Sequence, residues 1–200
     1  MITDPIFEQV YNHNLLRKLE SRFGLFTQPH IELAGSTGVL AEMIHKIKDR
    51  GRRGEVVMVV PNEQGRIWLH TKSFYPEGVF RLMTGGLDAG EKPHRAMRRE
   101  LAEETGLKTR IDRCLAVITY TLVADELTLP FVSYVFLTNP AVALPQPADP
   151  KEAITRFQAV AVAKLPAVAR QLRSLAGEFA DWGVFRAIAH EVAWQQLQMG

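Results

Sequence analysis

Hydrophobic residues recur at helical spacing towards both ends of the chain and at strand spacing in its middle. Apolar positions three and four residues apart place one apolar stripe on a helix, so helices are expected in both outer regions. In the last of them Trp182 and Phe185 belong to an aromatic stripe that predicts core packing or a dimer contact. The expected helices cover about residues 4–23, 37–49, 165–175 and 178–197.

Short β-branched runs separated by turn signals predict a sheet in the middle of the chain. Two of these runs flank the turn sequence PNEQG, which predicts a hairpin. Both faces of the run at residues 127–137 are apolar, so we expect this strand to be buried on both sides. A basic, glycine-rich linker is expected at residues 49–55. The expected strands cover about residues 55–60, 66–70, 79–83, 111–123, 127–137 and 154–162, with loops at 73–78 and 140–150.

Composition narrows the function classes without choosing among them. A net charge of +2 is too small a bias to favour nucleic acid or a membrane surface as the partner. The single cysteine, Cys114, excludes an intrachain disulfide and a multi-cysteine metal site. The N-terminus lacks the pattern of a secretory signal, and the apolar runs are far shorter than the ~20 residues of a membrane helix. We therefore expect a cytoplasmic protein.

Residues 85–107, GGLDAGEKPHRAMRRELAEETGL, carry the strongest chemical signal. A helix is expected at residues 93–105, and on it Glu100, Glu103 and Glu104 fall one turn apart on one face. Like charges at this spacing repel each other, so local helix energetics does not favour them. Mg²⁺ and Mn²⁺, however, prefer carboxylate oxygens. The spacing therefore predicts a divalent metal site.

The surroundings of these glutamates fit that hypothesis. Arg99 adjoins Glu100, and a guanidinium can fix a carboxylate through two hydrogen bonds, so we expect Arg99 to orient a glutamate of the motif. Gly85, Gly86 and Gly90 allow a close approach of the backbone to a ligand. A glutamate run alone is usually a solvated helix face. The complete pattern, with its fixed residue types, has a chance of roughly one in ten million of arising at random in a chain of this length.

Residues 85–107 resemble the signature box of the Nudix hydrolases at every fixed position. The resemblance implies an α/β class fold, the family's α/β/α sandwich with a mixed sheet. It also implies dependence on Mg²⁺ or Mn²⁺ and attack of water on the pyrophosphate of a nucleoside diphosphate linked to another group, X. It extends over about residues 54–177, so we expect an N-terminal helical extension at 1–53 and a C-terminal helix at 178–200.

The resemblance also implies roles for single residues. The glutamates of the box and the carbonyl of Gly85 would bind metal, and one further glutamate outside the box would act as base or ligand. Glu152 is the first candidate for that glutamate and Glu126 the second, although a plain surface charge is the commoner role for each. The expected metal ligands are Glu100, Glu103, Glu104 and Gly85; the expected catalytic residues are Glu103, Glu100, Arg99, Glu91 and Glu152.

The substrate is left open by the sequence. Lys72 and Arg81 precede the box and are candidates for binding substrate phosphates, with solvated surface charge an equal alternative. Tyr75, Phe80 and Tyr120 could stack on a base, but core packing is the commoner role of a lone aromatic residue. The signs of the better-known Nudix subfamilies are missing, which leaves a small-molecule nucleotide or nucleoside diphosphate derivative as the expected partner.

Two other functions are compatible with this fold. The first is a catalytically weak, nucleotide-sensing or regulatory protein of the same fold, which usually carries an eroded box. The second is an isomerase of isopentenyl diphosphate, which needs a catalytic cysteine ahead of the box, whereas Cys114 follows it. The intact box favours the hydrolase. The helices at both ends further suggest a homodimer.

Overall fold

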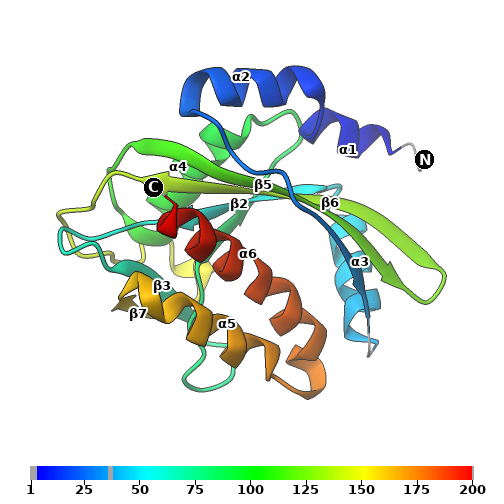
Figure 1. Ribbon diagram of the computed structural model, residues 1–200. Helices are drawn as coiled ribbons and strands as arrows, with labels where there is room; N and C mark the ends of the chain where they lie inside the picture. The colour runs from blue at the N-terminus through cyan, green and yellow to red at the C-terminus, as the bar shows by residue number, and fades with distance from the viewer. Residues whose placement is uncertain (1–3, 36–37, 200) are drawn as a thin grey trace.

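The computed structural model describes residues 4–35 and 38–199 and shows a mixed sheet held between helices (Figure 1). The helices are α1 (Pro5–Val10), α2 (His13–Phe23), α3 (Val39–Asp49), α4 (Pro93–Thr105), α5 (Leu165–Arg173) and α6 (Ala180–Gln198). Three short 3₁₀ turns, at Pro150–Glu152, Val162–Lys164 and Gly177–Phe179, complete the helical segments. The strands are β1 (His30–Ala34), β2 (Gly54–Val59), β3 (Ile67–Lys72), β4 (Met83–Gly86), β5 (Ile111–Ala124), β6 (Leu127–Thr138) and β7 (Ile154–Val160).

The main sheet has five strands in the order β1-β5-β6-β2-β4. β2 lies parallel to β6, β1 lies parallel to β5, and the pairs β5–β6 and β2–β4 are antiparallel. Every residue of β2 is buried, as expected for a strand that is covered on both faces. The pairing of β2 with β4 places Gly85 opposite Val56 and thereby fixes the start of the box against the centre of the sheet.

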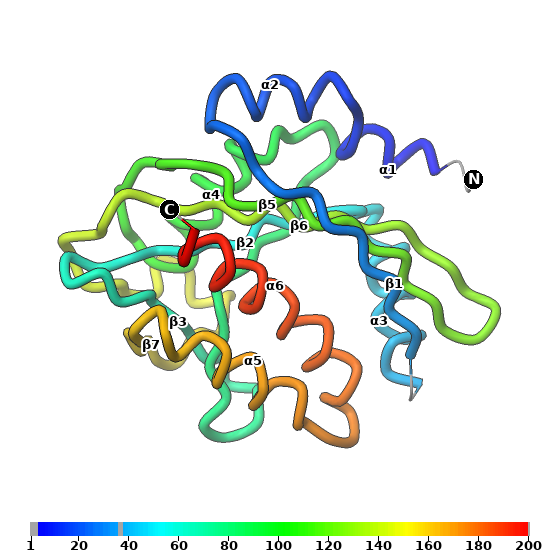
Figure 2. The backbone as a smooth tube through the Cα atoms, in the orientation of Figure 1, coloured from blue at the N-terminus to red at the C-terminus, as the bar shows by residue number. Residues whose placement is uncertain are grey.

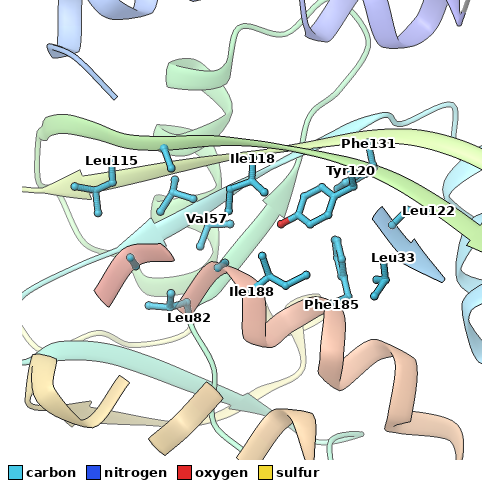
Figure 3. Packing of buried hydrophobic residues seen from close by; sticks show 14 of the residues in the cluster. Leu33, Val57, Leu82, Leu115, Ile118, Tyr120, Leu122, Phe131, Phe185 and Ile188 are labelled. Atoms are coloured by element: carbon cyan, nitrogen blue, oxygen red, sulfur yellow. The ribbon is translucent and has the colours of Figure 1, made fainter. Parts of the chain in front are cut away.

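Two hydrophobic cores fill the spaces between the sheet and its helices. Residues of α1, α2 and α4 pack on one face of the sheet, and residues of α3 and α6 pack on the other. Figure 1 shows α1 and α2 on one side of the sheet and α5 and α6 on the opposite side. In the second core the rings of Tyr120, Phe131 and Phe185 meet with centroids 5.1–6.3 Å apart (Figure 3). The aromatic stripe of α6 therefore contributes to the core of this chain.

The hairpin predicted around the turn PNEQG was wrong in its pairing. The turn itself closes, since the Trp68 amide donates to the Val60 carbonyl at 2.9 Å. Beyond it the strands diverge, because β4 and β6 take both edges of β2. β3 instead pairs with β7 in a separate two-stranded sheet. The next predicted strand, at 79–83, is also displaced to Met83–Gly86, because Val79 packs with α5 and α6.

The N-terminal region differs from its prediction in two ways. Its first helix is broken into α1 and α2, because Asn12 caps α2 by accepting a hydrogen bond from the Leu15 amide. β1, which was not predicted, joins the sheet beside β5 (Figure 2), so the extension is not only helical. The expected start of the second helix at Thr37 lies outside the described residues, and α3 begins at Val39. No helix within the described ranges is long and apolar enough to cross a membrane.

Candidate active site

The helix α4 carries the glutamates and begins and ends where its sequence indicates. Pro93 occupies the first turn, where its missing amide hydrogen has no partner to lose, and Gly106 ends the helix in the left-handed region with φ of 63°. Ala96, Met97 and Leu101 bury the apolar side of α4 against the sheet. Glu100 consequently faces β4, and Glu104 faces β3.

Arg99 lies at the centre of a network of carboxylates. Its guanidinium donates to Glu91 at 2.7 and 3.1 Å, to Glu100 at 2.7 Å and to Glu103 at 3.1 Å. It also donates to the Gly86 carbonyl at 3.0 Å, which connects α4 to β4. These hydrogen bonds raise the pKa of Arg99, and the bond from Arg99 lowers the pKa of Glu91. Arg99 therefore stays charged and fixes the orientation of three carboxylates.

Gly85 and Glu100 are in close contact between β4 and α4. A Cβ atom at Gly85 would lie 1.9 Å from Glu100 Cγ and 2.4 Å from Glu100 Oε2. Only glycine leaves room for this carboxylate beside the strand. Burial raises the pKa of Glu100, an effect that Arg99 opposes without cancelling. The result is a carboxylate held against the backbone with its proton affinity increased.

Glu104 is fully buried, unlike its neighbour Glu103, whose side chain is 41% exposed. Lys72 Nζ lies 3.0 Å from Glu104 Oε1 as an ion pair, and His70 Nδ1 lies 3.8 Å from Oε2. Within the described residues neither Glu104 oxygen nor either His70 nitrogen has a well-directed hydrogen-bond partner. Burial raises the pKa of Glu104 to about 7, although Lys72 acts against this rise. A buried carboxylate with unfilled acceptor capacity is thus present at the site.

Lys72 connects the box helix to the segment before β7. Its Nζ donates to Glu152 Oε2 at 2.7 Å while it contacts Glu104, so one ammonium group bridges two carboxylates. Burial would lower the pKa of Lys72, but Glu104 and Glu152 outweigh burial and raise it. The bridge brings Glu152 to the site from 48 residues beyond Glu104 in the sequence.

A cavity of about 600 Å³ lies beside these carboxylates. Glu100, Glu103 and Glu152 line it together with Gly85 and Arg81. Arg81 is buried and donates to Tyr75 Oη at 2.8 Å and to Thr84 Oγ1 at 3.0 Å. The cavity therefore combines carboxylates for a cation with guanidinium groups for an anion.

The other sequence candidates lie elsewhere or have packing roles. Glu126 is exposed at the turn between β5 and β6 and is not among the residues that line the cavity. Tyr120 is in the core and Phe80 packs against it, as the commoner role for each predicted. Residues from α3, its C-terminal cap and α6, including Arg50 and Trp182, line the cavity without having been predicted. Trp182 belonged to a helical stripe and Arg50 to a basic linker, and neither signal indicates a site.

The donor set fits a hard divalent cation. Within residues 4–35 and 38–199 no three His, Cys, Asp or Glu side chains are already gathered for a metal ion. Arg99 contacts Glu100 and Glu103, and Lys72 forms an ion pair with Glu104, so these cations now compensate the carboxylate charges. The Glu104 oxygens lack a directed hydrogen-bond partner within the described residues, and Glu100 lies against the backbone of Gly85, so the group offers the oxygen donors that Mg²⁺ and Mn²⁺ prefer.

Comparison with known proteins adds a family match. The family model described as the NUDIX domain matches residues 51–182. Over 70 residues the chain is 39% identical to an RNA pyrophosphohydrolase of Pectobacterium atrosepticum, which covers 35% of this chain and 38% of that protein. The RNA pyrophosphohydrolase of Yersinia enterocolitica is 39% identical over 71 residues, 35% of this chain and 39% of its own. The match thus spans less than two fifths of the length of these relatives.

Solved structures of similar proteins include two hydrolases. A NUDIX hydrolase from Nitrosomonas europaea aligns with a TM-score of 0.49 and 17% identity, covering 71% of this chain and 89% of that one. A MutT NUDIX hydrolase from Burkholderia pseudomallei aligns with a TM-score of 0.46 and 24% identity, covering 70% of this chain and 95% of that one.

Proposed function

This chain belongs to the NUDIX domain family, and from that premise we propose that it is a metal-dependent hydrolase. Its reaction is cleavage of the pyrophosphate linkage of a nucleoside diphosphate derivative by attack of water on phosphorus. One observation carries the proposal: Glu100 and Glu103 from the box and Glu152 from a distant segment line the same cavity. Nudix hydrolases generally use a divalent metal ion, and the all-oxygen donor set favours Mg²⁺ or Mn²⁺ here.

Each carboxylate has a proposed part in holding the cation. Glu103 and Glu104 are the main ligands, Glu100 is a ligand or the base, and the Gly85 carbonyl is a further ligand. A bound divalent cation supplies Lewis acidity, neutralises phosphate charge and lowers the pKa of a coordinated water. The exposed carboxylate of Glu103 meets the open cavity, whereas that of Glu104 lies in the protein interior. This difference supports Glu103 as the ligand nearest the substrate.

Proton transfer is assigned to a carboxylate that reaches the cavity. Glu152 is our first candidate for the base that accepts the proton of the attacking water, because it lines the cavity and lies outside the Arg99 network. Glu100 is the second candidate, because burial raises its pKa towards the range in which a base works. Arg99 and Glu91 are proposed to keep Glu100 and Glu103 in place.

The two cations expected to bind substrate have different surroundings. Arg81 lines the cavity, where its hydrogen bonds to neutral groups leave its charge available to a phosphate. Lys72 is bound to Glu104 and Glu152. This pairing supports a role for Lys72 in positioning the two carboxylates, and not in direct contact with the substrate. A cytoplasmic location and a homodimer also stay predictions, and a monomeric mass by light scattering would contradict the dimer.

The direct test is a product-release screen of nucleoside diphosphate derivatives with Mg²⁺ and Mn²⁺, and with a chelator as the blank. Glu103→Gln should lower kcat at least 100-fold with a change in stability within about 0.5 kcal/mol, because the side chain is exposed. Glu126→Gln makes the same change at an exposed carboxylate that does not line the cavity and should leave kcat unchanged. Tight nucleotide binding without turnover of any substrate would favour the alternative, a nucleotide-sensing protein.

A further inference from the structure

One wall of the cavity is formed by α3, which precedes the residues that match the NUDIX domain. The residues that α3 and its C-terminal cap contribute, Met43, Lys46, Ile47 and Arg50, follow the spacing i, i+3, i+4 and i+7. They therefore lie on one face of the helix. This face presents two apolar side chains and two cations to the same cavity that the carboxylates of α4 line.

The position of α3 is fixed by contacts with the rest of the fold. Leu40 and Ile44 are fully buried in the core, and the Leu40 amide donates to Asp181 Oδ2 of α6 at 3.1 Å. On the next turn of α6, Arg186 donates to Glu55 of β2 at 2.6 Å. The helix α3 is consequently part of the packed structure, and this packing fixes the backbone that carries Lys46 and Arg50.

Lys46 and Arg50 lack a strong ion-pair partner, a property that they share with Arg81 among the described residues of the cavity wall. Arg99 is bound to carboxylates of the box, and Arg186 is paired with Glu55. The nearest carboxylate to Lys46 is that of Glu42 at 3.9 Å, and both side chains are more than 70% exposed, so this pair contributes little. Arg50 forms no ion pair within the part of the chain that the structure describes. The α3 side therefore offers uncompensated positive charge.

Aromatic side chains line the same cavity. Phe74 and Trp182 both line it, and Phe74 is 62% exposed. Tyr75 packs between them, with ring centroids 5.0 Å from Phe74 and 4.9 Å from Trp182. Aromatic faces suit a nucleobase. The volume of about 600 Å³ falls within the range of roughly 300–1,000 Å³ that is typical of small-molecule sites.

We infer that the α3 face formed by Lys46 and Arg50 binds a phosphate group of the substrate that lies beyond the cleaved linkage. The inference rests on the proposed function and names its substrate class: nucleotides whose distal group is itself phosphorylated, such as a nucleoside triphosphate. A nucleoside diphosphate sugar with a neutral sugar would leave the cations of α3 without an anion. Lys46 and Arg50 are thus specificity-determining residues outside the family box.

The test compares two substrates of the same base, a nucleoside triphosphate and a nucleoside diphosphate sugar, in charge-reversal variants. Arg50→Glu and Lys46→Glu should each raise KM for the triphosphate about tenfold or more, equivalent to about 1.4 kcal/mol, with kcat changed little. KM for the neutral sugar derivative should change less than about threefold. Lys48→Glu is the matched control, because Lys48 is exposed on the same helix but does not line the cavity.

A binding measurement separates the failure of this inference from the failure of the proposed function. Calorimetry with a methylene-bridged, non-hydrolysable nucleoside triphosphate needs no turnover. Weaker binding by Arg50→Glu than by Lys48→Glu would support the inference even if no substrate were hydrolysed. If Arg50→Glu and Lys48→Glu had the same KM for the triphosphate and the same calorimetric affinity, the inference would be overturned. Hydrolysis by the unaltered chain would still support the proposed function. A wild-type preference for the sugar derivative would also overturn it.

Discussion

The carboxylate of Glu100 fills the space that a side chain at Gly85 would need. An added Cβ would lie 1.9 Å from Glu100 Cγ, far inside any van der Waals contact. Gly85 lacks a positive φ, so its need for glycine is steric and does not arise from its backbone conformation. The strand and the helix of the box are therefore matched to each other through one glycine and one glutamate.

Gly85→Ala should displace the Glu100 side chain and with it the hydrogen bond from Arg99. We expect activity to fall at least tenfold and the free energy of unfolding to fall by about 1–3 kcal/mol, as for other overpacked sites. Gly38→Ala is the control, because an added Cβ there meets no atom within 4 Å and its φ is −60°. Denaturant unfolding measures the free energy of unfolding, and steady-state kinetics measures the activity. A fully active Gly85→Ala variant would refute the steric argument.

Arg99→Lys should disrupt the carboxylate network although it keeps the positive charge. A lysine ammonium cannot reproduce the planar fork that contacts Glu91, Glu100, Glu103 and the Gly86 carbonyl together. We expect kcat to fall at least tenfold and stability to fall by about 1–3 kcal/mol. Arg98→Lys makes the same change at an exposed neighbour and should be neutral. Equal kinetics for the two variants would contradict the proposed role of Arg99.

Lys72→Met should destabilise the metal-free protein, because it removes the cation paired with the buried carboxylate of Glu104. The loss should be about 2–4 kcal/mol, since an unpaired buried charge is costly. The pKa of Glu104 is already raised to about 7, so the folded state binds a proton more tightly than the unfolded state does. Stability therefore falls as pH rises through the interval from 4.5 to 7, and the variant should extend this fall to higher pH.

Thermal unfolding with a chelator and with added Mg²⁺ tests the Lys72 prediction at pH 6 and pH 8. Added cation should raise the Tm of Lys72→Met more than that of the unaltered chain, because it replaces the lost charge. Lys108→Met, at an exposed position, controls for the loss of one lysine. A Tm for Lys72→Met that matched this control at both pH values would show that the ion pair has no structural role.

His190 should make the fold sensitive to acid. It is buried, its Nε2 accepts from the Leu82 amide at 2.9 Å, and its Nδ1 therefore donates to the Arg186 carbonyl at 2.9 Å. Burial lowers the pKa of His190 to about 3, below its ordinary value of 6.5. Because the unfolded state takes up the proton first, stability present above pH 6.5 is lost as pH falls towards 3.

The measurement is the free energy of unfolding between pH 7 and pH 4. His190→Gln should lower the free energy of unfolding at pH 7. It should also reduce the slope of this free energy against pH by up to about 1.4 kcal/mol per pH unit, the value for one proton. The pKa of the buried His70 is also lowered, so His70 likewise makes stability fall as pH falls. This contribution is still present in His190→Gln. His45→Gln changes an exposed histidine and should leave the slope unchanged. An unaltered slope in His190→Gln would contradict the prediction.

The sequence alone determined the features that depend on local periodicity and on fixed spacing. The bounds of α4 followed from Pro93, its apolar face and Gly106, all within one segment. The long strands β5 and β6 followed from their apolar runs and the turn between them. The placement of the glutamates of the box on α4, and the match to the family, also needed no tertiary information.

Only the tertiary structure decided which distant segments meet. Sequence patterns do not show which strands take the two edges of β2, so the separation of β3 from β2 and the addition of β1 at the edge beside β5 could not be read from them. The burial of Glu104 beside Lys72, in contrast to the exposure of Glu103, depends on how β3 packs against α4. The cations of α3 reach the cavity because α3 and α6 dock on the same face of the sheet, and that docking is a property of the packed core.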